Sequence, residues 1–214
     1  MLWFLLTSHV AVSALGRVAQ PIAVSSVRDK MEATMRIGSP HGLENKTVVF
    51  INCPNPYAIS YLPPYRVHRN LPLPKNVRII ATGYNMYYFR RTDENTLLLE
   101  TYKGNILRNR KRTIAWSVNF FKNLSESFRN FAAFPIEAGE KFKVTGFTAE
   151  VTEVDKSGRP TEVIYTFDRP LDDPSLIWLQ WDWLKKSYEP FELPLMNRRI
   201  TFPGPPRRQK ADKK

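Results

Sequence analysis

The chain of 214 residues has little cysteine, histidine or glycine. Its one cysteine, Cys53, excludes an intrachain disulfide and a cysteine-based metal cluster. A single thiol is permitted in every compartment, so it gives no localisation. Nine glycines stand against seventeen prolines, a balance that is typical of short strands joined by fixed turns and that disfavours a helical bundle.

The three histidines do not fall into a recognisable catalytic or metal-binding motif. A hydrolase needs a nucleophile, a base and a group that orients the base. His9 lies in an apolar leader, and His41 and His68 lie in proline-rich stretches without a nucleophile elbow. Cys53 could pair with His68, but its position at a strand end beside a proline favours a small buried side chain. We therefore expect no catalytic activity, no cofactor and no bound metal.

Acidic residues are absent between Asn45 and Thr92, whereas Lys46 and six further basic residues lie there. Aromatic residues are interleaved with the basic ones, as in proteins that bind single-stranded nucleic acid, but no nucleic-acid motif accompanies them. A solvated basic face ranks first among the explanations, a lipid or other polyanion second, and nucleic acid third. The residues predicted as possible polyanion contacts are Arg66, Arg69, Lys75, Arg78, Arg90 and Arg91.

Long hydrophobic runs are missing too. The apolar segment from Leu2 to Leu15 is shorter than the roughly 20 residues that a membrane-spanning helix needs. Residues 1–16 are interpreted as the remnant of a membrane span or as a signal segment, with a buried helix as the alternative. Behind them, residues 17–40 have apolar side chains at helical spacing and are predicted to form an amphipathic linker helix.

What the chain does have is enough apolar material for one substantial domain: 43% of its residues are hydrophobic and 13% are aromatic. We place this β-rich domain at residues 41–203. The net charge is +12, and the segment from Arg207 to Lys214 holds five basic residues and one acidic residue. Residues 204–214 are therefore predicted to form a disordered basic tail.

The pattern of strands is clearest between Lys141 and Trp183, where apolar side chains recur at every second position. The turn signal from Asp155 to Pro160 separates the two arms of a predicted hairpin. Residues 141–151 read as one continuous strand on the first arm. The side chains predicted to share one buried face across the hairpin are Phe147, Val151, Val163, Tyr165 and Phe167.

Other strands are predicted from β-branched and aromatic runs at residues 47–52, 77–82, 86–90, 96–101, 176–183, 188–193 and 198–202. Six prolines between Pro54 and Pro74 indicate that residues 53–74 are irregular. Residues 116–131 have aromatic and leucine side chains at helical spacing, which suggests one short helix packed on the sheet. The whole pattern predicts a mostly β fold, an antiparallel sandwich or a partly open barrel, behind an N-terminal helical, apolar segment.

Three stretches of the β-rich part are distinctive: Arg91–Leu99, Gly158–Pro160 and Asp168–Leu176. They resemble the C-terminal soluble β-rich region of uncharacterised bacterial polytopic membrane proteins, in which a multi-span part ends in such a region. The resemblance covers about residues 47–202. It implies that residues 2–15 are the tail of a last membrane span, and it carries over no functional residue.

The sequence thus predicts a non-catalytic, membrane-associated accessory domain, the C-terminal part of a larger membrane protein. Its expected partner is the membrane or a membrane-embedded protein. A secreted or soluble polyanion-binding module is the alternative. Basic residues behind the apolar segment favour the cytoplasmic side of the membrane, whereas a signal peptide would place the domain outside, so the side stays open. The sequence does not indicate an oligomeric state.

Overall fold

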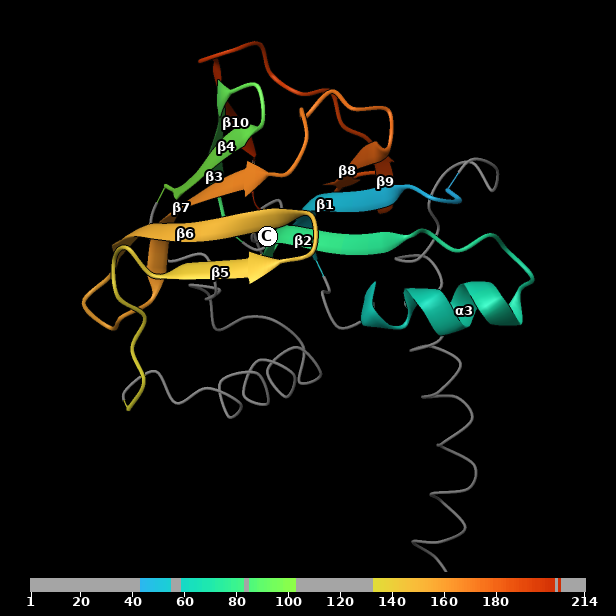
Figure 1. Ribbon diagram of the computed structural model, residues 1–214, viewed down its shortest axis with the longest axis horizontal. Helices are drawn as coiled ribbons and strands as arrows, with labels where there is room; N and C mark the ends of the chain where they lie inside the picture. The colour runs from blue at the N-terminus through green and yellow to red at the C-terminus, as the bar shows by residue number, and fades with distance from the viewer. Residues whose placement is uncertain (1–42, 55–58, 83–84, 103–132, 203, 205–214) are drawn as a thin grey trace, which may run out of the picture.

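The structure is a computed structural model that describes residues 43–54, 59–82, 85–102, 133–202 and 204 (Figure 1). Within these residues the chain forms ten strands in two sheets and one short helix, α3 (Leu62–His68). The prediction of a mostly β, sandwich-like fold is confirmed. The predicted N-terminal segments, the helical stretch at residues 116–131 and nearly all of the basic tail lie outside the described residues.

The smaller sheet has the strand order β2-β1-β8-β9. Its strands are β1 (Thr47–Cys53), β2 (Asn76–Thr82), β8 (Leu176–Asp182) and β9 (Ser187–Pro190). The central strand β1 pairs in parallel with both β2 and β8, and β8 pairs antiparallel with β9. These parallel pairs correct the prediction of an antiparallel sandwich. The β1–β2 pair is possible because α3 lies in the crossover that returns the chain from the end of β1 to the start of β2.

The larger sheet has the order β10-β3-β4-β7-β6-β5, and all of its neighbouring strands are antiparallel. Its strands are β3 (Tyr87–Asp93), β4 (Thr96–Thr101), β5 (Lys141–Val144), β6 (Phe147–Val154), β7 (Pro160–Phe167) and β10 (Arg199–Phe202). Strand β5 is therefore one edge of this sheet and β10 is the other.

The β6–β7 hairpin has the register that the sequence predicts. Phe147 lies opposite Phe167, and Val151 lies opposite Val163. All four side chains are buried, as is that of Tyr165 between them. In the turn, Asp155 Oδ1 accepts hydrogen bonds from the backbone N–H groups of the second and fourth residues after it, as expected for an Asp-initiated turn.

Two hydrophobic clusters lie on opposite faces of the smaller sheet. Val49 and Ile51 of β1 point into the larger cluster, which fills the space between the two sheets. Val48 and Phe50 point into the smaller cluster, which α3 covers with Leu62. Because β1 is covered on both faces, Val48 to Cys53 are all buried, and this explains the apolar run from Val48 to Ile51. The buried side chain of Asn52 is hydrogen-bonded to the backbone of Trp181. The molecule therefore has three layers: the larger sheet, the smaller sheet and α3.

Three predicted elements need correction. Residues 141–151 form two strands, because the chain reverses at Thr145-Gly146, where Gly146 has a φ of 100°. Residues 53–74 are not wholly irregular, since α3 lies among them with prolines in its first turn, where a missing N–H costs no hydrogen bond. The strand predicted at 188–193 ends at Pro190.

Candidate binding groove

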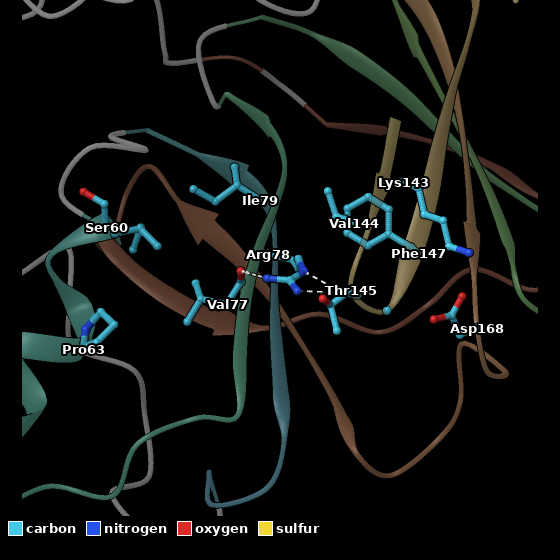
Figure 2. A pocket seen from close by; sticks show the side chains of 12 residues that line it. Ser60, Pro63, Val77, Arg78, Ile79, Lys143, Val144, Thr145, Phe147 and Asp168 are labelled. Atoms are coloured by element: carbon cyan, nitrogen blue, oxygen red, sulfur yellow. Dashed lines mark hydrogen bonds between the residues drawn. The ribbon is translucent and has the colours of Figure 1, made fainter. Parts of the chain in front are cut away.

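A groove of about 890 Å³ opens between the two sheets (Figure 2). One wall comes from the edge strand β2 and the residues that lead into α3. The opposite wall comes from the edge strand β5 and the β5–β6 turn. Two sheet edges that are far apart in the sequence thus face one opening.

Arg78 links the two walls of the groove. Its Nε and Nη2 atoms donate to the carbonyl oxygen of Thr145 at 3.1 and 2.6 Å, and its Nη1 atom donates to the carbonyl oxygen of Val77 at 2.9 Å. Figure 2 shows the guanidinium between β2 and the β5–β6 turn, with these bonds dashed. Most N–H donors of the Arg78 guanidinium therefore bond to protein oxygens, and this side chain joins the two sheets.

The remaining lining of the groove is largely apolar. Val77 and Ile79 lie on the side of β2 toward Ser60 and Pro63 (Figure 2). Val144 and Phe147 lie on the β5–β6 side, and Arg78 lies between the two sets of apolar side chains. The nearby start of α3 adds Ile59. Val144 is exposed at the rim. Apolar walls bounded by strand edges are suited to holding an extended peptide segment.

Two charged side chains of opposite sign complete the lining, Lys143 and Asp168. Figure 2 shows both on the β5 side, away from α3. They add polar groups to that end of the groove, whereas the Arg78 guanidinium lies in its middle between the two walls. Lys143 lies on an edge strand, where a lysine also discourages indiscriminate strand pairing.

The six predicted polyanion contacts do not form one surface. Arg78 joins the two walls of the groove, and Arg66, on the inner face of α3, is buried with 2% of its surface exposed. Arg69 and Lys75 are exposed around the end of α3. The last two, Arg90 and Arg91, belong to β3 in the other sheet.

Two of these arginines, Arg66 and Arg91, bond to other parts of the fold. Arg66 Nε donates to the carbonyl oxygen of Pro72, its Nη2 atom has no hydrogen-bond partner among the described residues, and burial lowers the pKa of its guanidinium. Arg91 forms an ion pair with Asp172 and donates to the carbonyl oxygen of Glu94. By contrast, Arg90 is exposed.

The thiol of Cys53 is buried in the smaller cluster, with its Sγ atom 3.1 Å from Tyr188 Oη. This confirms the interpretation of Cys53 as a small buried side chain. His68 is exposed on α3. In the described part of the chain, no three or more histidine, cysteine, aspartate or glutamate side chains gather closely enough to hold a metal ion.

The groove was not predicted, because its walls come from segments that are separated by dozens of residues in the sequence. The sequence signal for it was weak: a lysine-bearing strand at 141–144 is typical of a sheet edge. Nothing in the sequence indicated that this edge would face β2.

No family model matches the chain, and neither a curated protein nor a solved structure matches it significantly. The described ranges contain no helix that is both long enough and apolar enough to cross a membrane.

Proposed function

We propose that this chain is a membrane-associated accessory domain without catalytic activity of its own, which binds an extended segment of a membrane-embedded partner. The observation that carries this proposal is the groove in which β2 and β5 face each other. Each of these strands pairs on one side only in the described part of the fold.

Edge strands can bind an extended segment of another chain. Their outer backbone N–H and C=O groups can pair with an added strand, while side chains on the neighbouring walls select its residues. In this groove Val77, Ile79 and Val144 supply apolar contacts for such a segment. An apolar segment with carbonyl and amide groups free for pairing fits this lining best.

The state of Arg78 favours binding over reaction chemistry in the groove. A guanidinium that stabilises developing negative charge must direct its N–H groups at the reacting atoms. Arg78 directs them at the carbonyl oxygens of Val77 and Thr145 instead. Its charge therefore contributes to holding the walls together.

Membrane association is supported by the sequence. The apolar segment from Leu2 to Leu15 has the length of a signal-peptide core or of an interfacial segment, both of which contact membranes.

The binding part of the proposal is tested with the purified full chain and a displayed library of random peptides. Selected peptides should be apolar at alternate positions, since successive side chains of a strand point to opposite sides. Val144→Asp, at the rim of the groove, should weaken their binding by roughly tenfold or more, about 1.4 kcal/mol. Thr201→Asp, on the distant edge strand β10, is the matched control. Peptides that bind both variants equally well would contradict the groove as the site.

The membrane part is tested by fractionation of cells that express the full chain. An anchored domain should stay in the pellet after an alkaline carbonate wash, because only apolar insertion resists that treatment. Release of the intact chain by the wash would contradict anchoring, and release of a shortened chain would indicate a cleaved signal segment.

A further inference from the structure

The outer face of α3 carries exposed apolar side chains next to the exposed His68. Tyr61, which caps the helix, is 57% exposed and Val67 is 59% exposed. Pro64, between them in the sequence, is exposed as well. The opposite side of the helix is buried through Leu62 and Arg66. A short helix with its inner face in the core normally turns charged side chains outward, and α3 exposes these apolar ones instead.

The segment that follows α3 extends this face. Arg66 Nε donates to the carbonyl oxygen of Pro72, and the backbone N–H of Leu71 donates to the carbonyl oxygen of Arg66 at 2.8 Å. These bonds hold the segment against the end of the helix. It presents Leu73, a further exposed apolar side chain, and the exposed Lys75.

Most of the charges around this face are positive. Arg69 follows the helix directly and lies 5.8 Å from the centre of the Tyr65 ring. Lys75 is exposed a few residues further on. The sequence has no carboxylate between Asn45 and Thr92, but the exposed Glu44 pairs with Pro74 in an isolated bridge beside Lys75. The face therefore combines exposed apolar side chains with an excess of positive charge at its border, two features of helices that lie in the interface of anionic membranes.

The point where the chain enters the domain lies on the same side. Leu43, the first described residue, is buried in the smaller cluster together with Ile59 and Leu62 of the α3 region. Residues 1–42, which include the apolar segment from Leu2 to Leu15, therefore join the domain beside α3. A segment in the membrane would bring this side of the domain to the bilayer surface.

We propose that the outer face of α3 rests on an anionic lipid bilayer. Tyr61 and Val67 enter the interface between headgroups and acyl chains, where tyrosine is favoured, and Arg69 and Lys75 contact lipid phosphates. This inference rests on the proposed membrane association and adds the surface and the lipid chemistry through which it occurs.

The test places an environment-sensitive fluorophore on single added cysteines in the full chain. Val67→Cys reports on the proposed face. Thr201→Cys, exposed on β10, is the control, and Figure 1 shows β10 on the side of the molecule away from α3. Cys53 is fully buried and should not react, which labelling of the unmodified chain verifies. The labelled chains are bound to vesicles of phosphatidylcholine and phosphatidylglycerol that contain acyl-chain nitroxide quenchers.

The expected result is strong quenching of the probe at Val67→Cys and none at Thr201→Cys. Replacing Arg69 and Lys75 by serine should lower the ratio of docked to undocked domain roughly fivefold per residue in anionic vesicles. The same replacements should have little effect in vesicles of phosphatidylcholine alone.

The outcomes separate the two levels of the proposal. A chain that sediments with vesicles while its Val67→Cys probe stays aqueous overturns the α3 face but leaves membrane association in place. Equal quenching at both positions also overturns the specific face. A chain that does not sediment with either type of vesicle overturns the proposed membrane association and this inference with it.

Discussion

Arg66 is a charged residue whose surroundings compensate its charge only in part. Its guanidinium is buried, donates to one carbonyl oxygen and leaves Nη2 without a partner among the described residues. A buried charge with incomplete compensation carries a desolvation penalty of several kcal/mol. Packing of the long aliphatic stem of Arg66 therefore contributes more to stability than its hydrogen bond to Pro72.

We therefore expect Arg66→Met to leave the free energy of unfolding unchanged or to raise it by about 1–2 kcal/mol, because methionine keeps most of the packing and removes the charge. Urea denaturation at neutral pH measures this. A decrease of about 2 kcal/mol or more would show that the guanidinium has a favourable partner in solution.

Phe167 differs from Arg66 because its buried side chain is wholly apolar and needs no hydrogen-bond partner. It is buried against Phe147 and Trp178, with ring centroids 5.2 and 5.3 Å away. Phe167→Ala should lower the free energy of unfolding by about 3–5 kcal/mol, because the cavity lies in the middle of the core. Thr166→Ala, on the exposed face of the same strand, should cost far less. Similar losses for the two variants would contradict the hairpin register.

At the scale of single elements, the two arginines of β3 should differ. Arg91 forms an ion pair with Asp172 and hydrogen bonds in the β3–β4 turn, and its side chain is 12% exposed, whereas Arg90 is exposed. Arg91→Ser should therefore lower the free energy of unfolding by about 1 kcal/mol, with part of this loss removed by high salt. Urea denaturation at low and high salt measures both effects.

Arg90→Ser is the control and should be close to neutral. If the two arginines instead formed a polyanion surface, both replacements would weaken binding to anionic vesicles or single-stranded nucleic acid and reduce its salt dependence. We expect neither replacement to have that effect, since the two side chains have different surroundings.

The elements that the sequence predicts well are those whose signals are local. The β6–β7 hairpin follows from alternation over Phe147 to Val151, from the turn at Asp155, and from alternation over Val163 to Phe167. The direction of β1 relative to β2 and β8 has no local signal, because it depends on where the intervening chain returns to the sheet. The prolines of α3 led the sequence analysis to predict an irregular segment, although proline is tolerated in the first turn of a helix.

The candidate site could be predicted least. A count of basic residues treats Arg66, Arg78 and Arg91 as equivalent, yet one is buried, one joins two sheets and one is paired with a carboxylate. The difference arises from tertiary contacts with residues such as Pro72 and Thr145. These contacts depend on how the chain folds, and composition does not contain them.

At the scale of the whole molecule, two buried tyrosines join the sheets. Tyr165 of β7 donates its hydroxyl to the carbonyl oxygen of Ile80 in β2 at 2.8 Å. Tyr87 of β3 has its Oη atom 3.1 Å from Thr82 Oγ1, also in β2. Burial raises the pKa of Tyr87 to about 12 and raises the pKa of Tyr165 further. Ionisation of either hydroxyl would place a negative charge between the sheets.

The stability of the fold should therefore fall at alkaline pH. Below about pH 10, tyrosine is protonated in both the folded and the unfolded chain, so its contribution is fully present. Above about pH 10 the unfolded chain releases these protons while the folded chain retains them, and each tyrosine then lowers the free energy of unfolding by about 1.4 kcal/mol per pH unit. The decrease from Tyr87 continues to about pH 12, where its folded form ionises, and that from Tyr165 continues higher.

Urea denaturation between about pH 9 and 12 measures this slope, and Tyr165→Phe tests the share of one hydroxyl in it. The variant should have a shallower slope, because the phenylalanine has no proton to release, while it loses the hydrogen bond to Ile80 at every pH. Its stability at neutral pH should therefore be lower than that of the unmodified chain, and the difference should shrink as the pH rises. An unchanged slope would show that the Tyr165 hydroxyl ionises as readily in the folded chain as in the unfolded one, and that the two sheets are less tightly closed around it than its burial indicates.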